Sequence, residues 1–324
     1  MPSINKRIVV GEGGERLDIF LVRHLDAGIT RSRLNNNIKA GEIKLNGKET
    51  KSGAILRAGD VIDIDIAEDS LQAVPEDIKL DIVYEDKYLI IINKPRGMVV
   101  HPGAGNRQGT LLNGLLFRAG ASREQDTPDK DEQPPERAGI VHRLDKNTAG
   151  LMVAALTAET SARLSEMFAK HEIKRTYIGL VEGRLEGDGV IDRNIARDPN
   201  RRTLFKTVEK RGRQAVTRYK VLENLGAGNQ VGVQGKRGVA MKWSLVQFNL
   251  ETGRTHQIRV HCKAIGHPLI GDIEYNPNSS IKTDGQLLES VEIEFVHPIT
   301  DKLIREKIGL SDKFRGILAQ IKPN

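Results

Sequence analysis

The feature that most constrains this fold is the density of strand-like segments after residue 78. Seven stretches are rich in β-branched or aromatic residues and are bounded by turn-forming residues. They cover residues 80–86, 88–95, 150–157, 174–183, 214–223, 241–251 and 290–298. Four stretches have helical spacing instead, at residues 109–120, 158–172, 254–266 and 314–321. This pattern predicts an α+β fold dominated by a mixed or antiparallel sheet.

The first 67 residues predict a separate, smaller α/β domain. Helices are expected over residues 14–28 and 31–41, and strands over residues 42–50 and 58–66. Asn46-Gly47 lies inside the first strand region and is a strong hairpin signal. Residues 68–77 are polar and contain a proline, so we interpret them as a linker to a larger domain over 78–324.

The charge distribution favours a long anionic partner. The 324-residue chain has a net charge of +7 and an isoelectric point near 9.4. Residues 31–57 and residues 197–213 each contain seven basic and two acidic side chains, a local +5. Two separate basic clusters suit an extended polyanion such as RNA better than a small ligand.

Cysteine content and hydropathy indicate the compartment. Cys262 is the one cysteine, which excludes an intrachain disulfide and a zinc site built from several cysteines. No apolar run approaches the ~20 residues that span a bilayer. We therefore expect a soluble, cytoplasmic protein that does not contact membranes.

The stretch "HRLDKNTAG" contains a candidate catalytic acid. Asp145 is the one carboxylate between residues 139 and 150, and Arg143 and Lys146 flank it. Taken alone, these nine residues favour a surface turn in which Asp145 pairs with a cation. The alternative is an ionised carboxylate that acts as a nucleophile. A glycosidase would need a second carboxylate at the same bond.

A second candidate stretch is "ETGRTHQIRVHC". On a helix, Thr255, Arg259 and Lys263 would share one face, and Arg254 would lie near the helix N-terminus, which favours a phosphate. The other interpretation is a solvated basic face. His256 and the two histidines that follow are spaced by five and six residues, which does not suit metal binding on one helix, so we expect no metal.

Two further features have less specific interpretations. The glycine-rich loop at 101–110 lacks the Gly-Lys-Ser/Thr of a phosphate-binding loop and matches no dinucleotide fingerprint. Tyr177 is one of five tyrosines and follows two cations. It is either a half-buried strand residue or a ring on which a base stacks.

Three quoted motifs resemble a known family. "AGIVHRLDKNTAGLMVAALT", "KRTYIGLVEG" and "LETGRTHQIRVHCKAIGHPLIGD" are similar to the three motifs of the RluA/RluD-type RNA pseudouridine synthases, and "VVHPGAGN" is closest to those acting on large-subunit ribosomal RNA. The N-terminal segment resembles an S4 RNA-binding domain. Ala149 departs from the family's usual serine, and residues 119–138 and 226–242 look like divergent loops.

The resemblance implies roles for individual residues. Asp145 would be the catalytic aspartate, Arg259 would hold it by a salt bridge, and Tyr177 would stack on the uracil and help remove the C5 proton. Arg143 would help displace the target uridine from its stack. The remaining implied contacts are His142, Arg254 and Thr255 with the substrate, and Arg31, Arg33, Lys39, Lys44 and Lys48 with RNA.

Together these features predict a monomeric enzyme that isomerises uridines of large-subunit ribosomal RNA without a cofactor. The reaction involves no redox change and no energy input, so side chains suffice. Three alternatives stay open from the sequence. They are a catalytically silent S4-type RNA-binding protein, a pseudouridine synthase acting on tRNA, and a carboxylate-based glycosidase.

Overall fold

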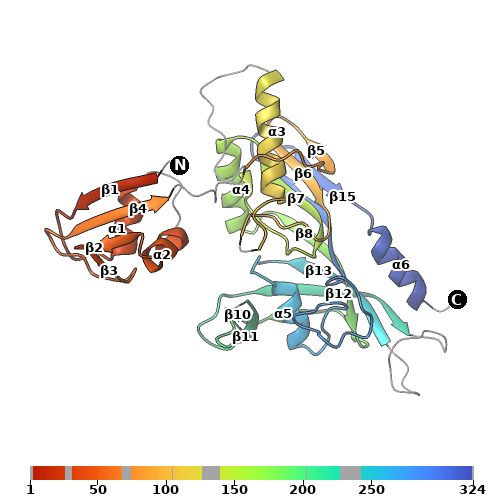
Figure 1. The fold of residues 1–324 in the computed structure, drawn as a ribbon. Coiled ribbons are helices and arrows are strands. Elements are labelled where there is room, and N and C mark those ends of the chain that lie inside the picture. Colours follow the sequence, from red (N-terminus) through yellow and green to blue (C-terminus); the bar gives the residue numbers. More distant parts are fainter. Residues whose placement is uncertain are drawn as a thin grey trace. The chain divides into compact units, whose positions relative to one another are not determined.

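The structure, a computed structural model, divides into two compact units, residues 1–72 and 73–324 (Figure 1). It describes residues 3–25, 31–67, 74–103, 105–125, 139–201, 203–226 and 242–322. Most of the two divergent loops, 126–138 and 227–241, therefore lies outside the described residues.

The first unit is a four-stranded antiparallel sheet with two helices. Its elements are β1 (Ser3–Val9), α1 (Leu17–His24), α2 (Arg31–Lys39), β2 (Ile43–Leu45), β3 (Lys48–Glu49) and β4 (Val61–Ala67), with the strand order β1-β4-β2-β3. The hairpin predicted at Asn46-Gly47 is confirmed, because it joins β2 to β3 with positive φ angles of 52° and 72°. Such angles define the tight turn that matches strand twist.

One face of this sheet carries the core of the unit. Ile62, Ile64 and Ile66 alternate along β4 and pack against buried residues of both helices, including Leu17 and Leu34. The sequence prediction missed β1, which is an edge strand paired only with β4. It also made α1 too long: the helix begins three residues later than expected and ends at His24.

The second unit is built on a nine-stranded mixed sheet. Its strands are β5 (Ile82–Glu85), β6 (Leu89–Lys94), β7 (Ala149–Ala155), β8 (Lys174–Glu182), β9 (Gly189–Asp192), β12 (Val216–Gly226), β13 (Lys242–Leu250), β14 (Leu288–Val296) and β15 (Leu303–Lys307). The order is β5-β6-β7-β14-β8-β13-β12-β9, with β15 added to β14. Every pairing is antiparallel except β7 with β14. The predicted α+β class with a mixed sheet is thus confirmed.

Four strands were not predicted. β9 and β15 are short, and β10 (Asn194–Arg197) and β11 (Phe205–Val208) form a separate two-stranded sheet. β10 and β11 carry cations and β15 alternates charged with apolar residues, so a short window contains little hydrophobic signal.

Helices cover both faces of the large sheet (Figure 1). They are α3 (Leu111–Gln125), α4 (Ala158–Ala169), α5 (Gln257–Ala264) and α6 (Asp312–Ile321). Along β6, Ile90 and Ile92 join the core beside α3 and α5, whereas Leu89 and Ile91 join the core beside α4. Burial on both faces explains why β6 and β7 are continuous apolar runs.

Three boundaries differ from the sequence prediction. α3 continues to Gln125, five residues beyond the predicted helix end at 120, and α5 begins at Gln257 rather than 254. The last residues of the predicted linker are hydrogen-bonded into the second unit: Glu76 accepts from the Gly109 N–H, and Asn113 donates to the Val74 carbonyl. Among the described helices, none is long and apolar enough to cross a bilayer.

The contact between β7 and β14 sets the tightest constraint in the sheet. Only two residue pairs form it, Ala149 with Glu289 and Gly150 with Ser290. Gly150 has φ of +113°, and a Cβ placed there would lie 2.1 Å from the Ser290 carbonyl oxygen. Because that neighbour is backbone, the two strands can approach this closely only with glycine.

We predict that Gly150→Ala lowers the free energy of unfolding by about 3 kcal/mol or more, because it adds both a backbone clash and a strained φ. Urea denaturation would measure the loss. Gly120→Ala is the control, since Gly120 is exposed in α3 with open space around it, and alanine there should add about 0.5–1 kcal/mol. Equal stabilities for the wild type and Gly150→Ala would contradict the constraint.

Candidate active site

The turn that carries Asp145 is fixed to the end of β6. The Asp145 carbonyl accepts the Thr148 N–H at 3.0 Å, just before β7 begins. Lys94 lies fully buried beneath the turn, and its ammonium donates to the carbonyls of Lys146, Pro95 and Met98. Burial lowers the pKa of Lys94 to about 7, although the charge of Asp145 opposes that shift. The turn that carries Asp145 is therefore held by side-chain as well as backbone hydrogen bonds.

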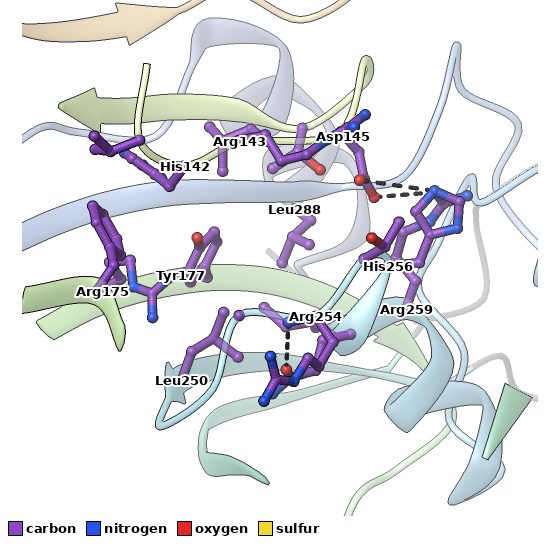
Figure 2. A pocket seen from close by; sticks show the side chains of 18 of the residues that line it. His142, Arg143, Asp145, Arg175, Tyr177, Leu250, Arg254, His256, Arg259 and Leu288 are labelled. Atoms are coloured by element: carbon purple, nitrogen blue, oxygen red, sulfur yellow. Dashed lines mark hydrogen bonds and ion pairs between the residues drawn. The ribbon is translucent and has the colours of Figure 1, made fainter. Parts of the chain in front are cut away.

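The Asp145 carboxylate is paired with a buried arginine of α5 (Figure 2). Arg259 Nη1 lies 3.1 Å from Asp145 Oδ2, and the exposed fractions of the two side chains are 6% and 17%. On its other side Arg259 makes a two-pronged contact with Asp272, at 2.7 and 2.8 Å, and donates to Glu274 at 2.6 Å. One guanidinium thus orients three carboxylates.

This network keeps Arg259 charged. Burial acts to lower the pKa of its guanidinium, but the hydrogen bonds and charge of Asp272, together with Asp145 and Glu274, raise the pKa above its ordinary value. Sequence reasoning did not assign Asp272 or Glu274. Their signal was present as two carboxylates in "GDIEY", 13 and 15 residues after the arginine.

His256 is a second neighbour of Asp145 that the sequence did not identify. Its Nε2 lies 3.8 Å from Asp145 Oδ1, and its φ of +57° turns the chain into α5. The Tyr275 hydroxyl accepts the Phe205 N–H and lies 2.9 Å from His256 Nδ1. If the hydroxyl proton is donated to Nδ1, the imidazole proton is on Nε2 and faces the carboxylate.

These groups open into a pocket of about 680 Å³. Tyr177 of β8 lines it with only 5% of its surface exposed, and Leu250, Ile258 and Leu288 add apolar walls. Burial raises the pKa of Tyr177 against the opposing charge of Arg175, and the charge of Asp145 adds to the rise, so the phenol stays protonated at neutral pH. Among the described residues that line the pocket, Asp145 is the sole carboxylate. A glycosidase pair is therefore not present there.

The other predicted substrate contacts line the same pocket in different ways. Arg143 is exposed, whereas the His142 ring stacks on Phe168 and its Nε2 accepts the Val153 N–H. Arg254 and Thr255 also line the pocket, but they precede α5, so the predicted shared helical face of Thr255, Arg259 and Lys263 is wrong. The left-handed residue at 256 separates them from the helix. Arg254 Nε donates to the Gln214 carbonyl.

The predicted RNA contacts lie in the first unit. Lys39, Lys44 and Lys48 are exposed there. Arg31 and Arg33 belong to α2, and their side chains are outside the described part of the chain. The second basic cluster falls on β10, β11 and their flanks, where the Arg197 guanidinium lies 5.3 Å from the centre of the Phe205 ring.

The histidines considered as metal ligands have separate partners. His261 contacts the Thr217 hydroxyl and the Arg193 carbonyl, and His267 contacts the Glu182 carbonyl. Within the described ranges, no three His, Cys, Asp or Glu side chains are grouped to hold a metal ion.

Comparisons with known proteins point to one family. Residues 88–264 match the family described as RNA pseudouridylate synthase. The chain is 40% identical to "Ribosomal large subunit pseudouridine synthase D" of Vibrio parahaemolyticus over 302 residues, covering 89% of this chain and 85% of the relative. It is 33% identical to "RNA pseudouridine synthase 2, chloroplastic" of Oryza sativa, covering 98% and 82%.

A solved structure has the same fold. "Human RNA Pseudouridylate Synthase Domain Containing 1" superposes with a TM-score of 0.55 at 22% identity, covering 76% of this chain and 89% of that one. The chain belongs to the RNA pseudouridylate synthase family. It is accordingly an RNA pseudouridine synthase, as the three motifs predicted.

His142 gives a prediction for stability against pH. Burial, with a smaller effect from the charge of Arg175, lowers the pKa of His142 to about 3. An unfolded histidine binds its proton near pH 6.5, so the unfolded state holds the extra proton between these values. The wild type should therefore lose about 1.4 kcal/mol of stability per pH unit, relative to His142→Gln, as pH falls below 6.5.

Urea denaturation of both proteins at pH 7, 5.5 and 4.5 would measure this difference. His171→Gln is the control, because it removes an exposed imidazole at the same pocket and leaves His142 in place. Parallel pH curves for the wild type and His142→Gln would show that the buried imidazole is not the titrating group.

Proposed function

We propose that this enzyme isomerises uridines of large-subunit ribosomal RNA and that Asp145 is its catalytic carboxylate. The observation that carries the proposal is the Asp145–Arg259 pair, 3.1 Å apart, at a pocket lined by a buried tyrosine. Relatives named for the ribosomal large subunit support the choice of RNA.

The chemistry requires one well-placed carboxylate. The N1–C1′ bond of uridine breaks, the uracil turns and C5 bonds to C1′, while C5 loses a proton and N1 gains one. The product is an isomer, so no oxidant or reductant is consumed. A carboxylate can add to C1′ or remove a neighbouring sugar proton to start this sequence. Arg259 supports either route by holding Asp145 in position.

Tyr177 is suited to stacking rather than to proton removal. Its raised pKa disfavours the phenolate, and its ring lines an apolar part of the pocket that can take the flat uracil. The target base must leave its stack to reach this pocket. Arg143, which is exposed at the pocket, is positioned to contact the strand from which the base has moved.

The two basic clusters would supply phosphate contacts. The exposed lysines of the first unit, which we propose to be an S4-type RNA-binding domain, lie on or beside the β2–β3 hairpin and α2. Such contacts give affinity that depends strongly on salt and little on sequence. Recognition of particular uridines then rests on the shape of a structured RNA.

We predict that Asp145→Asn lowers the turnover rate at least about 1000-fold and leaves RNA affinity nearly unchanged, because the asparagine amide keeps the shape of the carboxylate but loses its charge. Purified protein would be incubated with unmodified large-subunit ribosomal RNA, and pseudouridines would be read by carbodiimide labelling and primer extension. Asp301→Asn is the matched control, since Asp301 is exposed and its φ of 56° suits asparagine.

The same assay separates the alternatives. New stops with the wild type and Asp301→Asn, but not with Asp145→Asn, would establish both the RNA and the carboxylate. Primer-extension stops on tRNA alone would show that the substrate is tRNA and not ribosomal RNA. Binding without turnover on any RNA would show a catalytically silent protein, and a fall in affinity as large as the fall in rate would make Asp145 structural.

We also predict that replacing Lys39, Lys44 and Lys48 with alanine weakens RNA binding and lowers the slope of log K against log salt. The slope should fall by about 0.7–0.9 for each phosphate that the variant no longer neutralises. Filter binding at several salt concentrations would measure it. The control replaces Lys170, Lys302 and Lys307, three exposed lysines of the second unit outside both clusters. Equal slopes for the two triple variants would show that these lysines of the first unit do not contact RNA phosphates.

A further inference from the structure

One buried cation at the pocket has no role in the proposed chemistry. Arg175 precedes Tyr177 by two residues on β8, so both side chains leave the same face of the strand. Arg175 lines the pocket and is only 7% exposed. Its Nε has no hydrogen-bond partner, and among the described residues no carboxylate lies within ion-pair distance of its guanidinium.

The setting of Arg175 differs from that of the buried Arg259 and of Arg96, which is partly buried. Arg259 contacts three carboxylates, and Arg96 lies 3.9 Å from Glu289. Arg175 instead has the Phe168 ring 5.2 Å from its guanidinium carbon, an attraction that leaves the positive charge uncompensated. Burying a charged group without an anion is costly, and a ligand that brings the anion offsets that cost when it binds.

The residue at position 253 has no side chain to crowd the guanidinium. A Cβ added to Gly253 would lie 3.1 Å from Arg175 Nη1, so a larger residue there would crowd the group. Ala169 and His171 line the same pocket and are exposed, which places an opening to solvent beside the α4 end of the pocket. A nucleic-acid strand can therefore reach this buried arginine.

The charge of the pocket indicates what binds there. Four arginines line it against one carboxylate, and that carboxylate, Asp145, is already paired with Arg259. Uracil and ribose are neutral, so the negative groups that RNA can bring are its phosphates. Guanidinium forks match phosphate oxygens in geometry as well as in charge.

Figure 2 shows Tyr177 between Asp145 and Arg175. We propose that Arg175 binds a phosphodiester next to the target uridine and so fixes the strand at the end of the pocket opposite the catalytic carboxylate. This inference rests on the proposed function, because it takes RNA as the substrate. The 5′ and the 3′ phosphate share the chemistry, and the experiment distinguishes them.

The test uses a nine-nucleotide RNA with one central uridine among adenosines. Fluorescence anisotropy gives its Kd when the phosphate 5′ or 3′ of the uridine is replaced by an uncharged methylphosphonate. With the wild type, one of the two replacements should weaken binding about tenfold or more. With Arg175→Met, the same replacement should change Kd less than twofold, because the guanidinium that binds the phosphate is absent.

Two further variants check this result. Lys174→Met removes the same charge from the adjacent residue of β8, which is exposed and paired with Glu294, and it should behave as the wild type. Arg175→Lys keeps the positive charge without the two-pronged geometry of the guanidinium. The methylphosphonate should therefore still raise the Kd of this variant, but less than that of the wild type. A thermal melt of each variant shows that the protein is folded.

Some outcomes would overturn the inference. If the methylphosphonate weakened RNA binding by Arg175→Met as much as binding by the wild type, another group would bind that phosphate. If neither replacement affected the wild type while Arg175→Met still had reduced affinity, Arg175 would contact the base instead. The measurement needs no turnover, so a failure of the proposed activity in the mapping assay and a failure here are separate results.

Discussion

The site depends on one guanidinium shared among three carboxylates. Asp272 accepts hydrogen bonds from two N–H groups of Arg259, and Glu274 accepts another. These two carboxylates therefore fix the arginine without a contribution from Asp145. A pair of buried charges is costly unless each is well oriented and hydrogen-bonded. Asp272 and Glu274 supply those hydrogen bonds on the side of Arg259 away from Asp145, which leaves Asp145 as the carboxylate of the network that lines the pocket.

The fold brings the partners of this network together from distant parts of the chain. Asp145 comes from the turn before β7, while Arg259 lies 114 residues later on α5. Tyr177 is supplied by β8, which pairs with β14, and β14 in turn touches β7 through Gly150. The catalytic candidate is therefore positioned by the centre of the sheet, whereas Arg143 and Thr255 are exposed at the pocket.

The sequence predicted the long strands well because burial on both faces made them apolar runs, as in β6 and β7. It missed β1, β10 and β11, in which charged residues weaken the apolar signal. It identified Asp145 and Arg259 through a resemblance of motifs, but it assigned no role to Lys94, Asp272 or Arg175. Their importance comes from burial and from partners far away in sequence, which neither spacing nor composition records.

The turn at Asp145 also bears on where motion can occur. Lys94 is fully buried and joins the turn to the end of β6 by its hydrogen bonds, and the chain then enters the middle of a nine-stranded sheet. Segments with buried hydrogen bonds and dense packing open only with the global unfolding of a protein. The fold consequently holds the carboxylate in place, and in the proposed reaction the RNA and exposed side chains such as Arg143 would supply the rearrangement that base flipping demands.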